Sequence, residues 1–135
     1  MRSKSFQSRL DNLESICQFV TQAAHEAGLD EAATYAVQLA VDEAATNIIE
    51  HAYQNSGEGV IECSYLILGD GLEITLVDHG IPFDPDAVPT PELNVPLEDL
   101  KPRGMGIYMM RKVMDEVRFE FSPQSNKLTL VKKKT

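Results

Sequence analysis

The fold is decided by residues 39 to 51, which read LAVDEAATNIIEH. This stretch is rich in alanine and contains neither glycine nor proline, so it favours a helix. Glu43 and Asn47 are four residues apart and therefore lie one turn from each other on that helix. An apolar stripe runs beside them and is formed by Val37, Val41, Ala44, Ile48 and Ala52. A carboxylate and an amide at the edge of such a stripe can serve a binding site, although for one helix alone a solvated edge is the commoner explanation.

The size and composition of the chain are those of a single globular domain, residues 1–135, with 43% hydrophobic and 24% charged residues. No apolar run approaches the roughly 20 residues that span a bilayer, and the first residues lack the apolar core of a secretion signal. The net charge of −9 disfavours broad contact with a nucleic-acid backbone. We therefore expect a cytoplasmic protein that neither enters a membrane nor binds nucleic acid directly.

Hydrophobic periodicity and turn residues predict two helices followed by a β-hairpin. The helices are expected from about Leu10 to Ala27 and from an N-cap at Asp30 to about Tyr53. The hairpin strands are expected at residues 60–68 and 72–78, joined by the turn sequence Gly69-Asp70-Gly71. The short polar segment from Ser3 to Ser8 is a candidate edge strand.

The second half of the chain begins with a proline-rich segment, residues 80–103, which holds six of the seven prolines. Prolines at this density exclude regular structure, so we expect a long loop that is either a functional lid or disordered. After Gly104-Met105-Gly106, apolar residues at helical spacing predict a third helix to about Asp115, and residues 117–121 and 127–132 predict a closing strand pair. The order of elements predicts an α+β fold, a two-layer sandwich in which a mixed but mostly antiparallel sheet carries helices on one face.

Two short glycine-containing motifs carry further chemistry. In Asp78-His79-Gly80, a carboxylate that can accept hydrogen bonds from an exocyclic amine is followed by a glycine, which lets a backbone come close to a ligand. Gly104 and Gly106 open a helix, where unpaired N–H groups and the positive end of the dipole suit phosphate. Each motif is weak alone, since the first is common turn chemistry and the second is neither a Walker A loop nor a dinucleotide fingerprint.

In combination these motifs are specific. Glu-x-x-x-Asn on a helix, Asp-x-Gly after a hairpin, a proline-rich loop and Gly-x-Gly opening a helix resemble the ATP site of the GHKL superfamily, which includes gyrase, histidine kinases, mismatch-repair ATPases and a heat-shock chaperone. The sequences VDEAATN at 41–47, DHGIPFDP at 78–85 and GMGI at 104–107 resemble its anti-sigma-factor serine kinase branch. The resemblance covers about residues 5 to 132.

The resemblance implies roles for individual residues. Glu43 would be the general base, and Asn47 would bind Mg²⁺ and hence the ATP phosphates through its carbonyl oxygen. Asp78 would recognise the adenine amine, and Gly80 would allow the base to approach. Thr129 on the last strand would lie near the adenine.

The resemblance also implies a phosphate-binding group around the start of the third helix. The backbone N–H groups that would hold the phosphates belong to Gly104, Met105 and Gly106. Arg103 or Lys101 would reach the γ-phosphate when the lid closes, an expectation drawn from position and charge.

The implied function is that of an anti-sigma factor with serine/threonine protein kinase activity, which also forms a homodimer. It would phosphorylate a serine of a STAS-type anti-sigma-factor antagonist and sequester a sigma factor, with ATP and ADP deciding which partner it holds. One alternative is an ATP-dependent binding module that transfers no phosphate, and the presence of Glu43 favours the enzyme over it. A second alternative is a histidine kinase catalytic domain, for which His25 is poorly placed as a phosphoacceptor.

Overall fold

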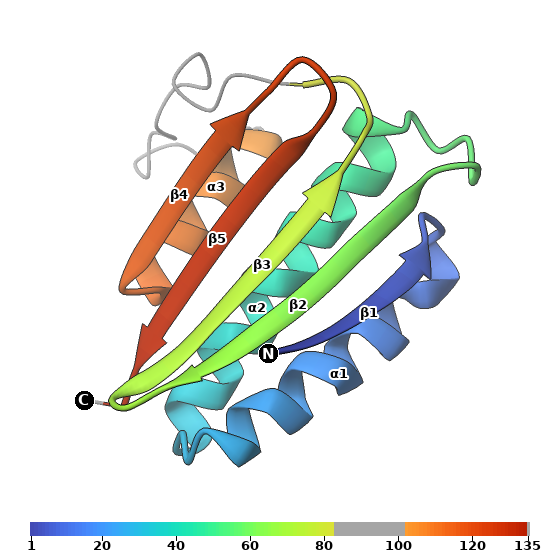
Figure 1. Cartoon of the computed structure of the whole chain (residues 1–135). Helices are drawn as coiled ribbons and strands as arrows, with labels where there is room; N and C mark the ends of the chain where they lie inside the picture. The colour runs from blue at the N-terminus through green and yellow to red at the C-terminus, as the bar shows by residue number, and fades with distance from the viewer. Residues whose placement is uncertain (83–101, 135) are drawn as a thin grey trace.

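The computed structural model describes residues 1–82 and 102–134, in which three helices cover one face of a five-stranded sheet (Figure 1). The strands are β1 (Arg2–Gln7), β2 (Val60–Leu68), β3 (Gly71–Asp78), β4 (Glu116–Phe121) and β5 (Asn126–Lys133). Their order in the sheet is β1-β2-β3-β5-β4, and all four pairings are antiparallel. The α+β two-layer fold is thus confirmed. The sheet was expected to be mixed but mostly antiparallel, and the described strands contain no parallel pair.

The helical elements follow the expected order. They are α1 (Leu13–Glu26), α2 (Glu31–Asn47) and α3 (Pro102–Val113), with a short 3₁₀ turn, η1 (Leu10–Asn12), before α1 and a π-helical turn, η2 (Ile48–Ala52), after α2. The predicted N-cap is confirmed, because the Asp30 carboxylate accepts a hydrogen bond of 2.8 Å from the Ala33 N–H. The helix expected to reach about Tyr53 does so only by changing to π geometry after Asn47, which the sequence did not indicate.

Several boundaries differ from those expected. β3, β4 and β5 each begin one residue earlier than predicted, at Gly71, Glu116 and Asn126. α3 begins at Pro102, so Gly104 and Gly106 lie inside its first turns rather than before it. Proline suits the first helical position, because its missing N–H would be unpaired there anyway and its φ is already helical. The predicted lid lies mostly outside the described residues, which stop at Pro82 and resume at Pro102.

The core lies between the sheet and the helices. α2 is the central helix, packed between α1 and α3, and its apolar stripe faces the sheet. The alternation predicted for β3 is confirmed, since Leu72, Ile74 and Leu76 are all at most 1% exposed. Burying each such side chain contributes about 1.5–3 kcal/mol. α2 therefore lies at the centre of the helical layer, in contact with both other helices and with the core.

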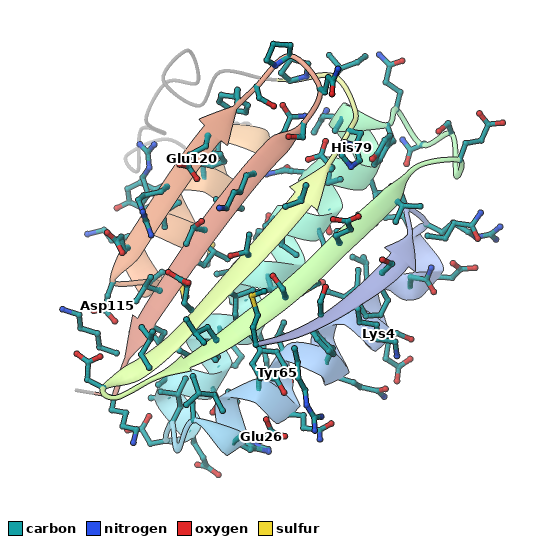
Figure 2. The ribbon with its side chains drawn as sticks, in the orientation of Figure 1. Lys4, Glu26, Tyr65, His79, Asp115 and Glu120 are labelled. Atoms are coloured by element: carbon teal, nitrogen blue, oxygen red, sulfur yellow. The ribbon has the colours of Figure 1, made fainter. Side chains whose placement is uncertain are left out.

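Side-chain contacts fix α1 to the sheet. Tyr65 of β2 points toward Glu26 of α1 (Figure 2), and its hydroxyl donates a hydrogen bond of 2.7 Å to the Glu26 carboxylate. Phe19 packs edge-to-face on Tyr65, with ring centroids 5.3 Å apart. No helix in the described parts of the chain combines the length and apolar character needed to cross a bilayer.

Candidate functional site

At one end of the molecule β3 and β4 finish, β5 begins and α2 passes into η2 (Figure 1). A pocket lies at this end. Of the twelve described residues that line it, eight are apolar and four are polar. The apolar ones are Ala44, Ile48, Ala52, Ile81, Met110, Phe119, Phe121 and Leu128, and the polar ones are Asn47, Asp78, Asn126 and Lys127. A mostly apolar wall with a few convergent polar groups is the usual character of a small-molecule site.

One end of the site is a junction between α2 and α3. A Cβ built on Gly106 would lie 2.7 Å from Oε2 of Glu43 and 3.7 Å from Nδ2 of Asn47. The structure therefore brings together the Glu-x-x-x-Asn helix and the second glycine of the Gly-x-Gly motif, as the resemblance implied. Glycine is needed at residue 106 because any side chain would displace the Glu43 carboxylate.

Asn47 has an unmet hydrogen-bonding requirement. Its Nδ2 atom is buried and has no partner among the described residues. The oxygen and nitrogen of a side-chain amide are distinguished only by their hydrogen bonds. One of these two atoms of Asn47 therefore lacks a partner among the described residues. Buried unpaired groups in native proteins need an explanation, and a ligand is one. An amide oxygen suits Mg²⁺, which takes few protein ligands beside phosphate and water, so Asn47 fits a magnesium nucleotide.

Glu43 lies half-buried beside Asn47. Burial raises the pKa of its carboxyl above the ordinary value of 4.5, and the negative charges of Asp42 and Glu50 raise it further. Asp42 itself is exposed. A carboxylate with a raised pKa accepts protons more readily than an ordinary one, which suits a general base.

The other end of the pocket is built by the sheet. Asp78, the last residue of β3, stands directly opposite Asn126, the first residue of β5. The two side chains are only 5% and 8% exposed. Oδ1 of Asp78 accepts hydrogen bonds from the Gly80 N–H, at 2.9 Å, and from Asn126 Nδ2, at 2.8 Å. Asn126 was missed by sequence reasoning, because only the strand register brings it across 48 residues to Asp78.

Gly80 lies in close contact with the backbone of η2. A Cβ on Gly80 would collide with the carbonyl oxygen of Ala52 and would lie 2.8 Å from the Ala52 Cβ. The same carbonyl accepts a hydrogen bond of 2.8 Å from the Ile81 N–H. The glycine therefore lets the segment after β3 pack on the π-helical turn, which is a different reason from the expected approach of a base.

Tyr53 is a second contact between these segments that the sequence did not reveal. Its hydroxyl accepts a hydrogen bond of 2.7 Å from the N–H of His79, which Figure 2 labels near the end of β3, and donates one of 2.9 Å to the Val60 carbonyl. Its ring covers Gly59, where a Cβ would collide with it. Tyr53 thus links the end of η2 to the corner that follows Asp78.

Thr129 and four residues around the start of α3 complete the set of residues that were expected to bind the nucleotide. Thr129 is buried but faces away from the helices, because it opposes Thr75 and alternates with the inward Leu128 and Leu130. The structure therefore does not bring Thr129 to the pocket. Gly104 lies in the first turns of α3, and the side chains of Arg103 and Met105, like the whole of Lys101, lie outside the described residues.

A sequence-family profile for the histidine kinase-like ATPase domain matches residues 6–132, almost the whole chain. The chain belongs to this family. The GHKL resemblance drawn from the three motifs is thereby confirmed. The comparison with curated protein sequences gives no significant match.

Solved structures show the same fold as this histidine kinase-like ATPase domain. One contains the RsbU and RsbW domains of Rv1364c from Mycobacterium tuberculosis, with a TM-score of 0.63 and 13% identity. The matched region covers 98% of the present chain but only 32% of the Rv1364c chain. Another is the histidine kinase domain of the blue-light activated histidine kinase from Erythrobacter litoralis EL346, with a TM-score of 0.55 and 18% identity over 90% of this chain and 60% of that one. At these identities the likeness concerns the fold alone.

Proposed function

We propose that this domain is a cytoplasmic, Mg²⁺-dependent protein kinase that transfers the γ-phosphate of ATP to a serine or threonine of a protein partner. The observation that carries the proposal is that three motifs far apart in the sequence lie at or beside one pocket. Asn47 and Asp78 line that pocket together, and Gly106 packs against Glu43 and Asn47. Acceptor groups at the sheet end suit the adenine, and the junction of α2 and α3 suits the phosphates.

The chain's own residues divide the work of phosphoryl transfer. The Glu43 carboxylate takes the proton of the attacking hydroxyl, whose oxygen forms a bond to the γ-phosphorus while the bond from that phosphorus to ADP breaks. Asn47 would hold Mg²⁺, which when bound neutralises phosphate charge. Such reactions depend mainly on positioning and charge stabilisation, so few catalytic side chains are expected.

The partners that we propose are a STAS-type anti-sigma-factor antagonist as phosphoacceptor and a sigma factor as the protein sequestered, with the kinase acting as a homodimer. The motifs at 41–47, 78–85 and 104–107 support this branch of the superfamily, and so does the structural neighbour with an RsbW domain. The raised pKa of Glu43 supports transfer rather than nucleotide binding alone.

The proposal is tested in two steps. Calorimetry with ATP and Mg²⁺ should first show binding by the wild-type chain. The protein is then incubated with Mg-ATP and STAS-domain proteins from the same organism, and phosphoserine or phosphothreonine is sought by mass spectrometry. We expect transfer by the wild type, and ATP binding without transfer by Glu43→Gln. Tight ATP binding by the wild type without transfer to any of these proteins would identify it as a binding module instead.

A further inference from the structure

The sheet end of the pocket contains a polar pair, Asp78 and Asn126, of which only Asp78 has an assigned role. We propose that Asn126 is a positioning residue that makes the pocket select a base bearing an exocyclic amine. This inference depends on the proposed function and extends it from nucleotide binding to base selection.

The orientation of the Asn126 side chain follows from its neighbours. Its Nδ2 atom donates to Oδ1 of Asp78, at 2.8 Å, and to the carbonyl oxygen of Gly80, at 3.1 Å. Both partners are acceptors, so the reversed amide would place its oxygen against two oxygens and lose both bonds. Both amide protons of Asn126 therefore form hydrogen bonds within the protein. Its side-chain carbonyl oxygen is the atom that can accept a hydrogen bond from a ligand.

The same contacts determine what Asp78 presents. Oδ1 accepts from Asn126 and from the Gly80 N–H, whereas Oδ2 takes part in no hydrogen bond with the described residues. Two donors on one oxygen fix the plane of the carboxylate. Because both residues line the pocket, its sheet end offers a ligand two acceptors, Oδ2 of Asp78 and Oδ1 of Asn126, and no side-chain donor from this pair.

A pair of acceptors that offers no donor discriminates between purines. The amine of adenine donates to such oxygens, while a carbonyl at the same ring position would face them with a third oxygen. Leaving a buried polar group unpaired costs more than a good hydrogen bond contributes, so the mismatch is penalised strongly. Asn126 is essential to this effect because without it a water molecule can enter, donate to the base and bridge the mismatch.

The test compares ATP with inosine triphosphate, which carries a carbonyl in place of the amine. Calorimetry with Mg²⁺ should give a wild-type preference for ATP of at least about tenfold. Asn126→Ala should reduce this preference to about two- or threefold. Asn126→Ser keeps one hydroxyl donor for Asp78 and should give an intermediate value. Circular dichroism establishes which variants are folded, and if Asn126→Ala is not, the serine variant decides.

A matched control is available at Asn12, whose side-chain amide also donates to an oxygen, the Gln7 carbonyl at 2.7 Å, but far from the pocket. Asn12→Ala should leave the ratio of the two affinities unchanged. An unchanged ratio in folded Asn126 variants overturns the role of Asn126 while leaving nucleotide binding intact. Failure of the wild type to bind ATP at all would instead overturn the proposed function.

Discussion

The two ends of the pocket differ in how completely their polar groups are paired before any ligand arrives. At the sheet end, Asp78 and Asn126 hold each other through a cross-strand hydrogen bond, and the corner beyond them is tied to η2. At the helix end, Asn47 has an amide atom without a partner among the described residues, and Glu43 is a half-buried carboxylate. The sheet end is thus preorganised, whereas the helix end depends on its ligand to complete it.

This contrast has a physical cause. Backbone register in an antiparallel sheet places opposite residues at fixed separation, so a polar pair such as Asp78 and Asn126 can be satisfied internally. Two helices meet only through side chains, and beside Gly106 no group of the described residues forms a hydrogen bond with the Asn47 Nδ2 atom. The variants below are chosen to break or sharpen this distinction.

The largest expected effect is that of Gly80→Ala at the sheet end. The added methyl group would collide with the Ala52 carbonyl, a backbone atom that cannot move aside without disturbing η2. We expect a loss of about 3 kcal/mol in the free energy of unfolding, at the upper end of the usual cost of overpacking. Urea denaturation followed by circular dichroism measures it. A loss below about 0.5 kcal/mol would show that this corner is not preorganised.

Asn47→Ala should give the next largest effect, and on binding rather than on folding. The variant removes an amide whose Nδ2 atom has no partner among the described residues, so the free energy of unfolding without ligand should change by less than about 1 kcal/mol. Affinity for ATP with Mg²⁺ should fall about 100-fold, which corresponds to roughly 2.7 kcal/mol. Calorimetry measures the ATP affinity of the wild type and of the variant, with and without Mg²⁺. If the ligand-free variant lost as much free energy of unfolding as it loses in free energy of ATP binding, Asn47 would be a structural residue.

These two ends also differ in how far the sequence predicts them. Glu43 and Asn47 follow from helical spacing, and Asp78 from its place at the end of a strand, because both are local patterns. Asn126 could not be found in this way, since its role depends on a register between strands that are far apart in the chain. Thr129 was expected near the adenine because it matches a threonine of the family, but its side chain lies on the other face of the sheet.

Backbone contacts were the least predictable feature. Sequence patterns gave the strands and helices within a few residues, and the hydrophobic alternation of β3 gave its buried face. The change to π geometry at Ile48–Ala52 has no signal in residue type, and so the packing of Ala52 on Gly80 was not expected. A glycine indicates that the backbone comes close to another group, and only the structure shows that at Gly80 this group is the Ala52 carbonyl of the protein itself.

Gly106→Ala, the counterpart of the first substitution, should have a smaller effect and a different one. Its added methyl group would meet the far end of the Glu43 side chain, which can rotate away. Within a helix, alanine is more favourable than glycine by about 0.5–1 kcal/mol, so stability should be kept or slightly increased. Phosphoryl transfer should fall about tenfold, as expected for a displaced base. A loss of stability as large as that of Gly80→Ala would remove the distinction between the two ends.

The smallest expected effect concerns the ionisation of Glu43. Because the folded protein raises the pKa of this carboxyl, its charged form is disfavoured by folding. The associated stability is therefore fully present below the ordinary pKa of 4.5 and is lost as the pH rises through the raised value. Glu43→Gln, which has no charge at any pH, should melt at a higher temperature than the wild type at pH 7 and at the same temperature near pH 4.

Thermal melts of the two proteins across this range, without nucleotide, test the pH dependence directly. A difference that grows toward low pH would reverse the sign and would mean that folding favours the carboxylate. Kinetics add a second measurement, since transfer by the wild type should decline as the pH falls through the raised pKa and the base becomes protonated. Agreement between the pH at which stability changes and the pH at which transfer declines would assign both to Glu43, and so to the helix end of the pocket.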